Sequence, residues 1–196
     1  MTTSPFEAFS RYEQDHGLPI GFIRTVNATD PDANAWARLE RGEIDLEEFS
    51  CRFESEARAL GYAVDAAAII DLLGGDVRPA MVDALRSYAK RYRTGLLTNN
   101  FSLARPSAPA RAEEVAAVVG IFDVVVESSK VGVRKPEERF FEIACEMLEI
   151  APQEAVFVDD LGVNLKPARK LGMTTIKFVT EAQALNDLDA VLGARP

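Results

Sequence analysis

The chain has 196 residues, of which 47% are hydrophobic and 27% charged, as in an ordinary globular protein with one good-sized domain or a core and a small appendage. A net charge of −9 argues against nucleic acid as a partner. No apolar run approaches the roughly 20 residues that span a bilayer, so no membrane contact is expected. Cys51, Cys145 and the single histidine, His16, form neither a zinc pattern nor a disulfide framework, so we expect a cytoplasmic protein with reduced thiols.

The first 78 residues differ in composition from the rest. Residues 1–78 carry 7 basic and 15 acidic side chains, whereas residues 79–196 carry 15 and 16. The pattern predicts only helices in 1–78, each with aromatic or aliphatic residues at helical spacing. These predicted helices lie after the capping box that starts at Ser4, around 22–23, around 36–39, and from Asp45 to Gly61. His16 falls at the end of the first helix, where we interpret it as a partner of the helix dipole.

The second part, 79–196, alternates between helices and short apolar strands. Strands are expected at 94–98, 122–126, 155–158 and 174–178, and helices at 79–90, 113–119, 136–148, 161–171 and from 181 onward. Such alternation with short connections predicts a doubly wound parallel sheet with helices on both faces. The sequence therefore predicts an α/β core beside a small helical part, with the boundary near Gly74, Gly75 and Pro79.

Two adjacent carboxylates, Asp159 and Asp160, follow the strand at 155–158 directly. Ligands of open α/β sheets bind beyond the carboxyl ends of the strands, so a metal or phosphate site is expected here. Neighbouring carboxylates oppose each other's ionisation unless a cation lies between them, and Mg²⁺ suits such ligands. In the alternative reading, Asp160 caps the helix that begins at Leu161, and Asp159 is solvated.

Two other strand ends contribute polar residues to the same edge of the predicted sheet. Thr98 and Asn99 end one strand, and another leads through Ser128 and Ser129 to Arg134 and Lys135. A hydroxyl, a cation and an acid pair are the groups that hold a phosphoryl group. Taken singly, the threonine could be a strand-end cap and the lysine a surface residue.

The segments LLTNN, ESSKVGVRKPEERFFEIACEMLEI and VFVDDLGVNLKPARKLGMTTIKF resemble the second, third and fourth motifs of the haloacid dehalogenase-like hydrolase superfamily. Within it, the chain is most similar to the phosphatase-type domains of soluble epoxide hydrolases and of acyl-CoA dehydrogenase-like proteins. The resemblance covers essentially the whole chain. It implies a Rossmann-like α/β core at 79–196 and a helical cap at 1–78.

The resemblance also implies roles for six residues around one phosphoryl group. Lys135 would neutralise the nucleophile and the phosphoryl group as a catalytic residue, and Mg²⁺ would be the cofactor. The implied phosphate-binding residues are Thr98 and Asn99, and the implied metal ligands are Asp159 and Asp160. Asn164, one helical turn beyond Asp160, would lie behind these ligands and support them.

The family's first motif has no counterpart in this sequence. That motif is a strand ending in the nucleophilic aspartate, whereas this chain opens with Met1-Thr2-Thr3-Ser4, as if just after it. The resemblance places the absent strand between the strands that end at Thr98 and Asp159. We therefore expect Met1 not to be the native start. We also expect the two flanking strands to close on each other, or the chain to be loose or to associate.

The sequence favours a Mg²⁺-dependent phosphatase that acts on a small phosphorylated metabolite through an aspartyl-phosphate intermediate. One alternative is a non-catalytic binding or regulatory protein of the same fold. A haloacid dehalogenase ranks lower, because displacement of halide from carbon needs no metal, whereas Asp159 and Asp160 are typical of a metal site.

Expressed as written, the chain should hydrolyse an aryl phosphate in the presence of Mg²⁺ at no more than background rate. Loss of a nucleophile lowers turnover by several orders of magnitude, even where binding groups remain. Robust turnover of a highly purified sample that disappears in Asp160→Ala would contradict this expectation.

Overall fold

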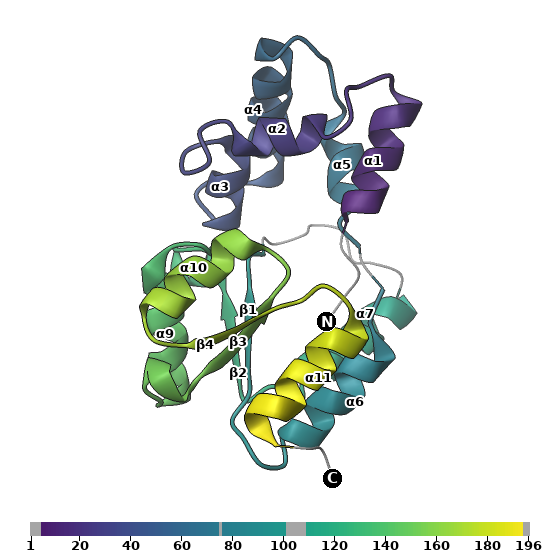
Figure 1. Cartoon of the computed structure of the whole chain (residues 1–196). Helices are drawn as coiled ribbons and strands as arrows, with labels where there is room; N and C mark the ends of the chain where they lie inside the picture. Colours follow the sequence, from purple (N-terminus) through teal and green to yellow (C-terminus); the bar gives the residue numbers. More distant parts are fainter. Residues whose placement is uncertain (1–4, 75, 101–108, 194–196) are drawn as a thin grey trace.

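The structure, a computed structural model, describes residues 5–74, 76–100 and 109–193. Residues 5–74 form the predicted helical part, which we call the cap (Figure 1). Its helices are α1 (Phe6–Asp15), α2 (Phe22–Ala28), α3 (Ala35–Glu40), α4 (Leu46–Ala59) and α5 (Ala66–Asp71). None of the helices in the described ranges has the length and apolar character needed to cross a membrane.

The residues from 76 onward form the α/β part, which we call the core. Its strands are β1 (Gly95–Thr98), β2 (Val124–Glu127), β3 (Val156–Asp159) and β4 (Thr174–Lys177). Its helices are α6 (Pro79–Tyr88), α7 (Pro109–Val119), α8 (Ser128–Val131), α9 (Glu138–Leu148), α10 (Gly162–Lys170) and α11 (Glu181–Leu192), with a short 3₁₀ turn at Pro152–Glu154. The predicted alternation of strands and helices is confirmed.

Local capping signals account for several helix starts. The side chains of Asn34, Asp45 and Asp65 accept a hydrogen bond from the backbone of the first turns of α3, α4 and α5. The predicted start at Asp45 is thereby confirmed. Helix α5 was not predicted, although Asp65 is a standard cap residue. The capping box assigned to Ser4 lies outside the described residues, and α1 begins at Phe6 after Pro5.

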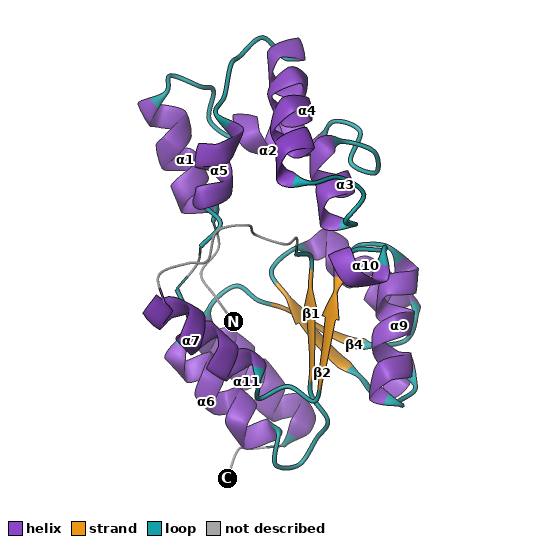
Figure 2. Ribbon diagram, turned by 180° about the vertical axis from the view of Figure 1, so that it is seen from behind, coloured by secondary structure: helices purple, strands orange, loops and turns teal. Residues whose placement is uncertain are grey.

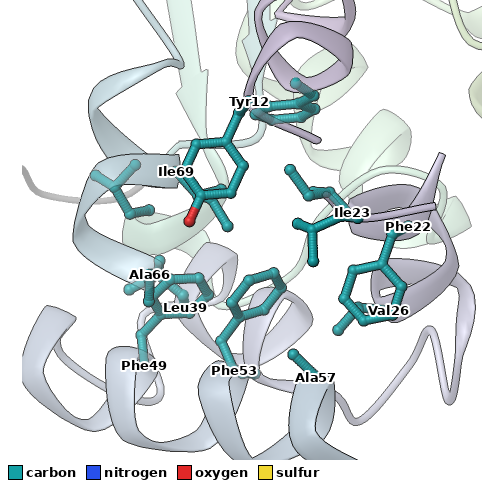
Figure 3. Close-up of a cluster of buried hydrophobic side chains, with 14 residues drawn as sticks. Tyr12, Phe22, Ile23, Val26, Leu39, Phe49, Phe53, Ala57, Ala66 and Ile69 are labelled. Atoms are coloured by element: carbon teal, nitrogen blue, oxygen red, sulfur yellow. The ribbon is translucent and has the colours of Figure 1, made fainter. Parts of the chain in front are cut away.

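The cap has a hydrophobic core of its own. Phe49 and Phe53 on α4 are fully buried and stack with ring centroids 5.2 Å apart, and Trp36 on α3 packs against both. Figure 3 shows these phenylalanines among Tyr12, Ile23 and neighbouring aliphatic side chains from the other cap helices. The aromatic spacing in 1–78 is therefore core packing.

The strands of the core form two separate parallel pairs. Strand β1 pairs with β2 from Gly95↔Val124 to Thr98↔Glu127, and β3 pairs with β4 from Val156↔Thr174 to Asp159↔Lys177. Helices α9 and α10 lie on one side of the strands, and α6, α7 and α11 on the other (Figure 2). Among the described residues β1 does not pair with β3. Of the expected alternatives, direct closure of these two strands on each other is therefore wrong, whereas a loose or associating chain stays a prediction.

Phe53→Ala should lower the free energy of unfolding of the cap by about 3–5 kcal/mol, because truncation leaves a cavity beneath Phe49 and Trp36. Urea denaturation followed by tryptophan fluorescence measures the loss. Ile20→Ala, at a position 83% exposed, is the matched truncation and should change stability by no more than about 0.5 kcal/mol. Equal effects would contradict the assignment of Phe53 to the cap core.

Candidate functional site

Lys135 lies between the two strand pairs at the carboxyl ends of β1 and β3. Its Nζ atom donates to Asp159 Oδ2 at 2.8 Å and to the backbone carbonyl of Leu97 at 3.1 Å. The lysine side chain is 13% exposed and the aspartate side chain 6%. The alternative of a surface lysine is therefore wrong: Lys135 is a buried cation that connects β1 with β3.

The two adjacent aspartates have different environments. Asp159 Oδ1 accepts from the Leu161 backbone N–H at 2.8 Å and from Asn164 Nδ2 at 3.0 Å, so both of its oxygens have protein donors. Asp160 is exposed, and its carboxylate makes no hydrogen bond or ion pair with the described residues. The alternative reading therefore fails for both residues. Asp159 is buried instead of solvated, and α10 has no cap bond from Asp160.

The amide of Asn99 holds the backbone of Lys135. Asn99 Oδ1 accepts from the Lys135 N–H at 2.9 Å, and Asn99 Nδ2 donates to the Lys135 carbonyl at 3.0 Å. Ser128, fully buried, supports the same edge because its Oγ atom accepts from the Asn100 N–H and donates to the Asn100 carbonyl. The loops after β1 and β2 are thus tied together beside Lys135.

A cap residue also reaches this edge. Glu40, at the end of α3, accepts from Arg134 Nη1 at 2.6 Å and from Asn99 Nδ2 at 3.0 Å. Burial raises the pKa of the Glu40 carboxyl above its ordinary value, while the charge of Arg134 acts in the opposite direction. Sequence reasoning missed Glu40, for which no motif gives a signal, and it assigned no role to Arg134.

Thr98 ends β1 as predicted. It lines a cavity of about 680 Å³ beside the β1–β2 pair and α7. Leu96, Val118 and Val125 contribute apolar walls to this cavity, whereas Lys135 is not among its lining residues. The structure thus brings Asn99, Lys135, Asp159 and Asn164 into one hydrogen-bonded group, with Thr98 one residue away along the chain.

The donor set fits a weakly held Mg²⁺. The described residues contain no group of three or more His, Cys, Asp or Glu side chains arranged for a metal. Mg²⁺ commonly uses only one or two carboxylates and completes its shell with water and phosphate oxygens. The exposed carboxylate of Asp160 suits this role, whereas the oxygens of Asp159 already have donors. Burial raises the pKa of the Cys145 thiol, so this cysteine is not an activated nucleophile.

Known proteins are similar to this chain in sequence. The family model for haloacid dehalogenase-like hydrolases matches residues 6–172. Acyl-CoA dehydrogenase family member 10 of Mus musculus is 33% identical over 98% of this chain and 18% of its own length. Phosphatase MT3486 of Mycobacterium tuberculosis (strain CDC 1551 / Oshkosh) is 32% identical over 92% of this chain and 79% of its own.

A solved structure shows the same fold. The putative HAD-hydrolase YfnB of Bacillus subtilis, solved bound to magnesium, superposes with a TM-score of 0.64 at 17% identity, covering 98% of this chain and 95% of that one. The chain spans 18% to 36% of the length of the mammalian relatives that it matches, bifunctional epoxide hydrolases among them. The chain belongs to the haloacid dehalogenase-like hydrolase family, and phosphatases are among its relatives.

Lys135→Met should lower the free energy of unfolding by about 3–5 kcal/mol, because the change leaves the buried Asp159 carboxylate without its cation. Lys170→Met is the control. It removes an exposed lysine that pairs with Glu138, and it should alter stability by less than about 1 kcal/mol. Chemical denaturation of both variants measures the difference. A Lys135→Met protein as stable as the parent would contradict a structural role for the pair.

Proposed function

We propose that the strand-end site is a Mg²⁺-dependent phosphate site of the phosphatase type, which takes a small phosphorylated metabolite. The observation that carries this proposal is the buried Lys135 at the carboxyl ends of β1 and β3, with the free carboxylate of Asp160 next to its partner Asp159. A fixed cation beside a metal-binding acid is the arrangement that stabilises charge on a transferring phosphoryl group. Phosphatase MT3486, among the relatives, supports this reaction class.

Each residue of the proposed site would contact either the phosphoryl group or the metal. Lys135 would place positive charge at the phosphoryl group and at an attacking carboxylate, and the Thr98 hydroxyl would donate to a phosphoryl oxygen. Asp160 would hold Mg²⁺ directly, and Asp159 would contribute through water or through its charge. Mg²⁺, when bound, would neutralise charge on the phosphoryl oxygens.

In the proposed chemistry an aspartate attacks phosphorus, an aspartyl-phosphate forms with departure of the alcohol, and water hydrolyses it. Such a nucleophile has to approach the phosphoryl group beside Lys135. Among the described residues, only Asp159 is within ion-pair distance of Lys135 Nζ, and its oxygens are engaged. We therefore assign phosphate and metal binding, but not the nucleophile, to the described residues.

The charge around the site favours a substrate whose remainder carries little negative charge. Arg134, the cation next to Lys135 in the sequence, is already neutralised by Glu40 of the cap. The residues of 1–78 carry 15 acidic against 7 basic side chains. A second strongly anionic group on the substrate would therefore face this acidic cap, and Arg134 would not be free to neutralise it.

A second candidate function is a non-catalytic binding or regulatory protein. The ion pair of Lys135 with Asp159 favours it, because the pair also connects the two strand pairs and would be retained for stability alone. A haloacid dehalogenase remains the lower alternative, since Asp160 would then have no metal to bind.

Titration calorimetry with inorganic phosphate tests the proposed site. Phosphate should bind more tightly with Mg²⁺ present, and the metal should be needed at millimolar concentration because most of its shell is water. Asp160→Asn should abolish the effect of Mg²⁺. Thr98→Val, which is nearly isosteric, should weaken phosphate binding about fivefold through loss of one hydrogen bond.

Thr174→Val at the exposed start of β4 is the matched control and should bind phosphate as the parent does. Absence of phosphate binding at millimolar concentration, or equal binding by Thr98→Val, would overturn the proposed function. Micromolar affinity for Mg²⁺ would show a more complete metal site than the described residues form.

A further inference from the structure

Glu40 is a buried carboxylate of the cap that contacts the core. It is the last residue of α3, and its side chain is 11% exposed. One oxygen accepts from both Arg134 Nη1 and Asn99 Nδ2, and the other accepts from Trp36 Nε1 at 3.1 Å. A single cap side chain thus contacts two residues of the core at the edge where Lys135 lies.

A chain of hydrogen bonds leads from Glu40 through Asn99 to Lys135. A side-chain amide has two N–H donors and one carbonyl acceptor. Asn99 directs its Nδ2 donors to Glu40 and to the Lys135 carbonyl, and its Oδ1 atom accepts from the Lys135 N–H. The Glu40 contact therefore favours the same orientation of the amide as the two bonds to the Lys135 backbone. The Lys135 side chain in turn reaches Asp159.

Attachment of the cap to the core does not depend on this contact alone. Arg134 Nη2 also donates to the Pro31 carbonyl, and Arg41 lies 3.7 Å from Glu137 across the same boundary. Gly42 approaches the backbone of Ser129 so closely that a Cβ atom there would lie 2.8 Å from its carbonyl oxygen. The specific consequence of the bond between Glu40 and Asn99 is the orientation of Asn99.

We propose that Glu40 is a positioning residue through which the seated cap orders Asn99 and Lys135 for binding of an anion. The inference rests on the proposed function, because it takes Lys135 as part of a phosphate site. If the cap orders the site, phosphate and the seated cap stabilise each other by the same factor.

Three paired substitutions test the proposal, each preserving net charge. Glu40→Leu/Arg134→Leu removes the acceptor for Asn99 and leaves no unpaired buried charge. Glu40→Gln/Arg134→Gln removes the same charges but keeps an amide oxygen that can accept from Asn99. Glu48→Leu/Arg52→Leu removes an exposed ion pair within α4 of the cap and serves as the control.

Calorimetry with inorganic phosphate should show about 5-fold weaker binding for the leucine pair at 40 and 134. The glutamine pair and the pair at 48 and 52 should bind as the parent does. A purely electrostatic effect predicts the same change in the leucine and glutamine pairs, because both remove the same two charges. Equal losses in the glutamine pair, or in the pair at 48 and 52, would overturn the proposal.

Hydrogen exchange of the Lys135 backbone N–H, measured by NMR without ligand, tests the inference separately from the proposed function. This exchange should be about 5-fold faster in the leucine pair at 40 and 134 and unchanged in the other two. If the parent fails to bind phosphate, the proposed function fails. If the Lys135 N–H exchanges at the parental rate in a folded leucine pair, the positioning role fails.

Should the leucine pair not fold, the parent protein itself provides the test. By reciprocity, saturating phosphate should slow exchange of the Trp36 indole N–H, which donates to Glu40. An unchanged exchange rate at saturation would overturn the proposal.

Discussion

The buried ion pair between Lys135 and Asp159 is the interaction on which the arrangement of the core depends. Two parallel strand pairs lie side by side without a shared ladder, and Lys135 joins them at their carboxyl ends. A charge removed from water needs a partner and hydrogen bonds, and both ions have them here. Leu97 of β1 and Phe157 of β3 also pack in one apolar cluster with residues of α9 and α10. Apolar contacts therefore join the two strand pairs as well.

The same pair sets the chemistry that the site can perform. Both oxygens of Asp159 accept hydrogen bonds, from Lys135, Leu161 and Asn164. The neighbouring Asp160 is therefore the carboxylate that is available to a metal. If Lys135 serves both stability and the proposed anion binding, loss of function on its replacement has two explanations. Thr98, whose side chain has no such structural duty among the described residues, separates the two roles better.

Among the described residues, the cap and the core are joined by polar contacts, and their buried hydrophobic clusters are separate. The aromatic cluster around Phe49 and Phe53 is complete within the cap. Contact with the core comes from the end of α3, where Glu40 pairs with Arg134 and Arg41 lies 3.7 Å from Glu137. Polar interfaces of this kind permit relative motion more readily than large apolar ones. A carboxylate at such an interface can transmit the position of the cap to the site.

The sequence by itself determined most of the secondary structure and the edge of the sheet at which the predicted site residues meet, because these depend on local signals. Caps such as Asp45, the alternation of apolar strands with helices, and the meeting of parallel strand ends all follow from neighbouring residues. Only the tertiary structure decided which of Asp159 and Asp160 is buried, and that β1 and β3 stay apart. It alone also brought Glu40 to Asn99 and Arg134, across 59 and 94 residues of chain. Burial and the choice of partner depend on packing between distant segments, which local periodicity does not encode.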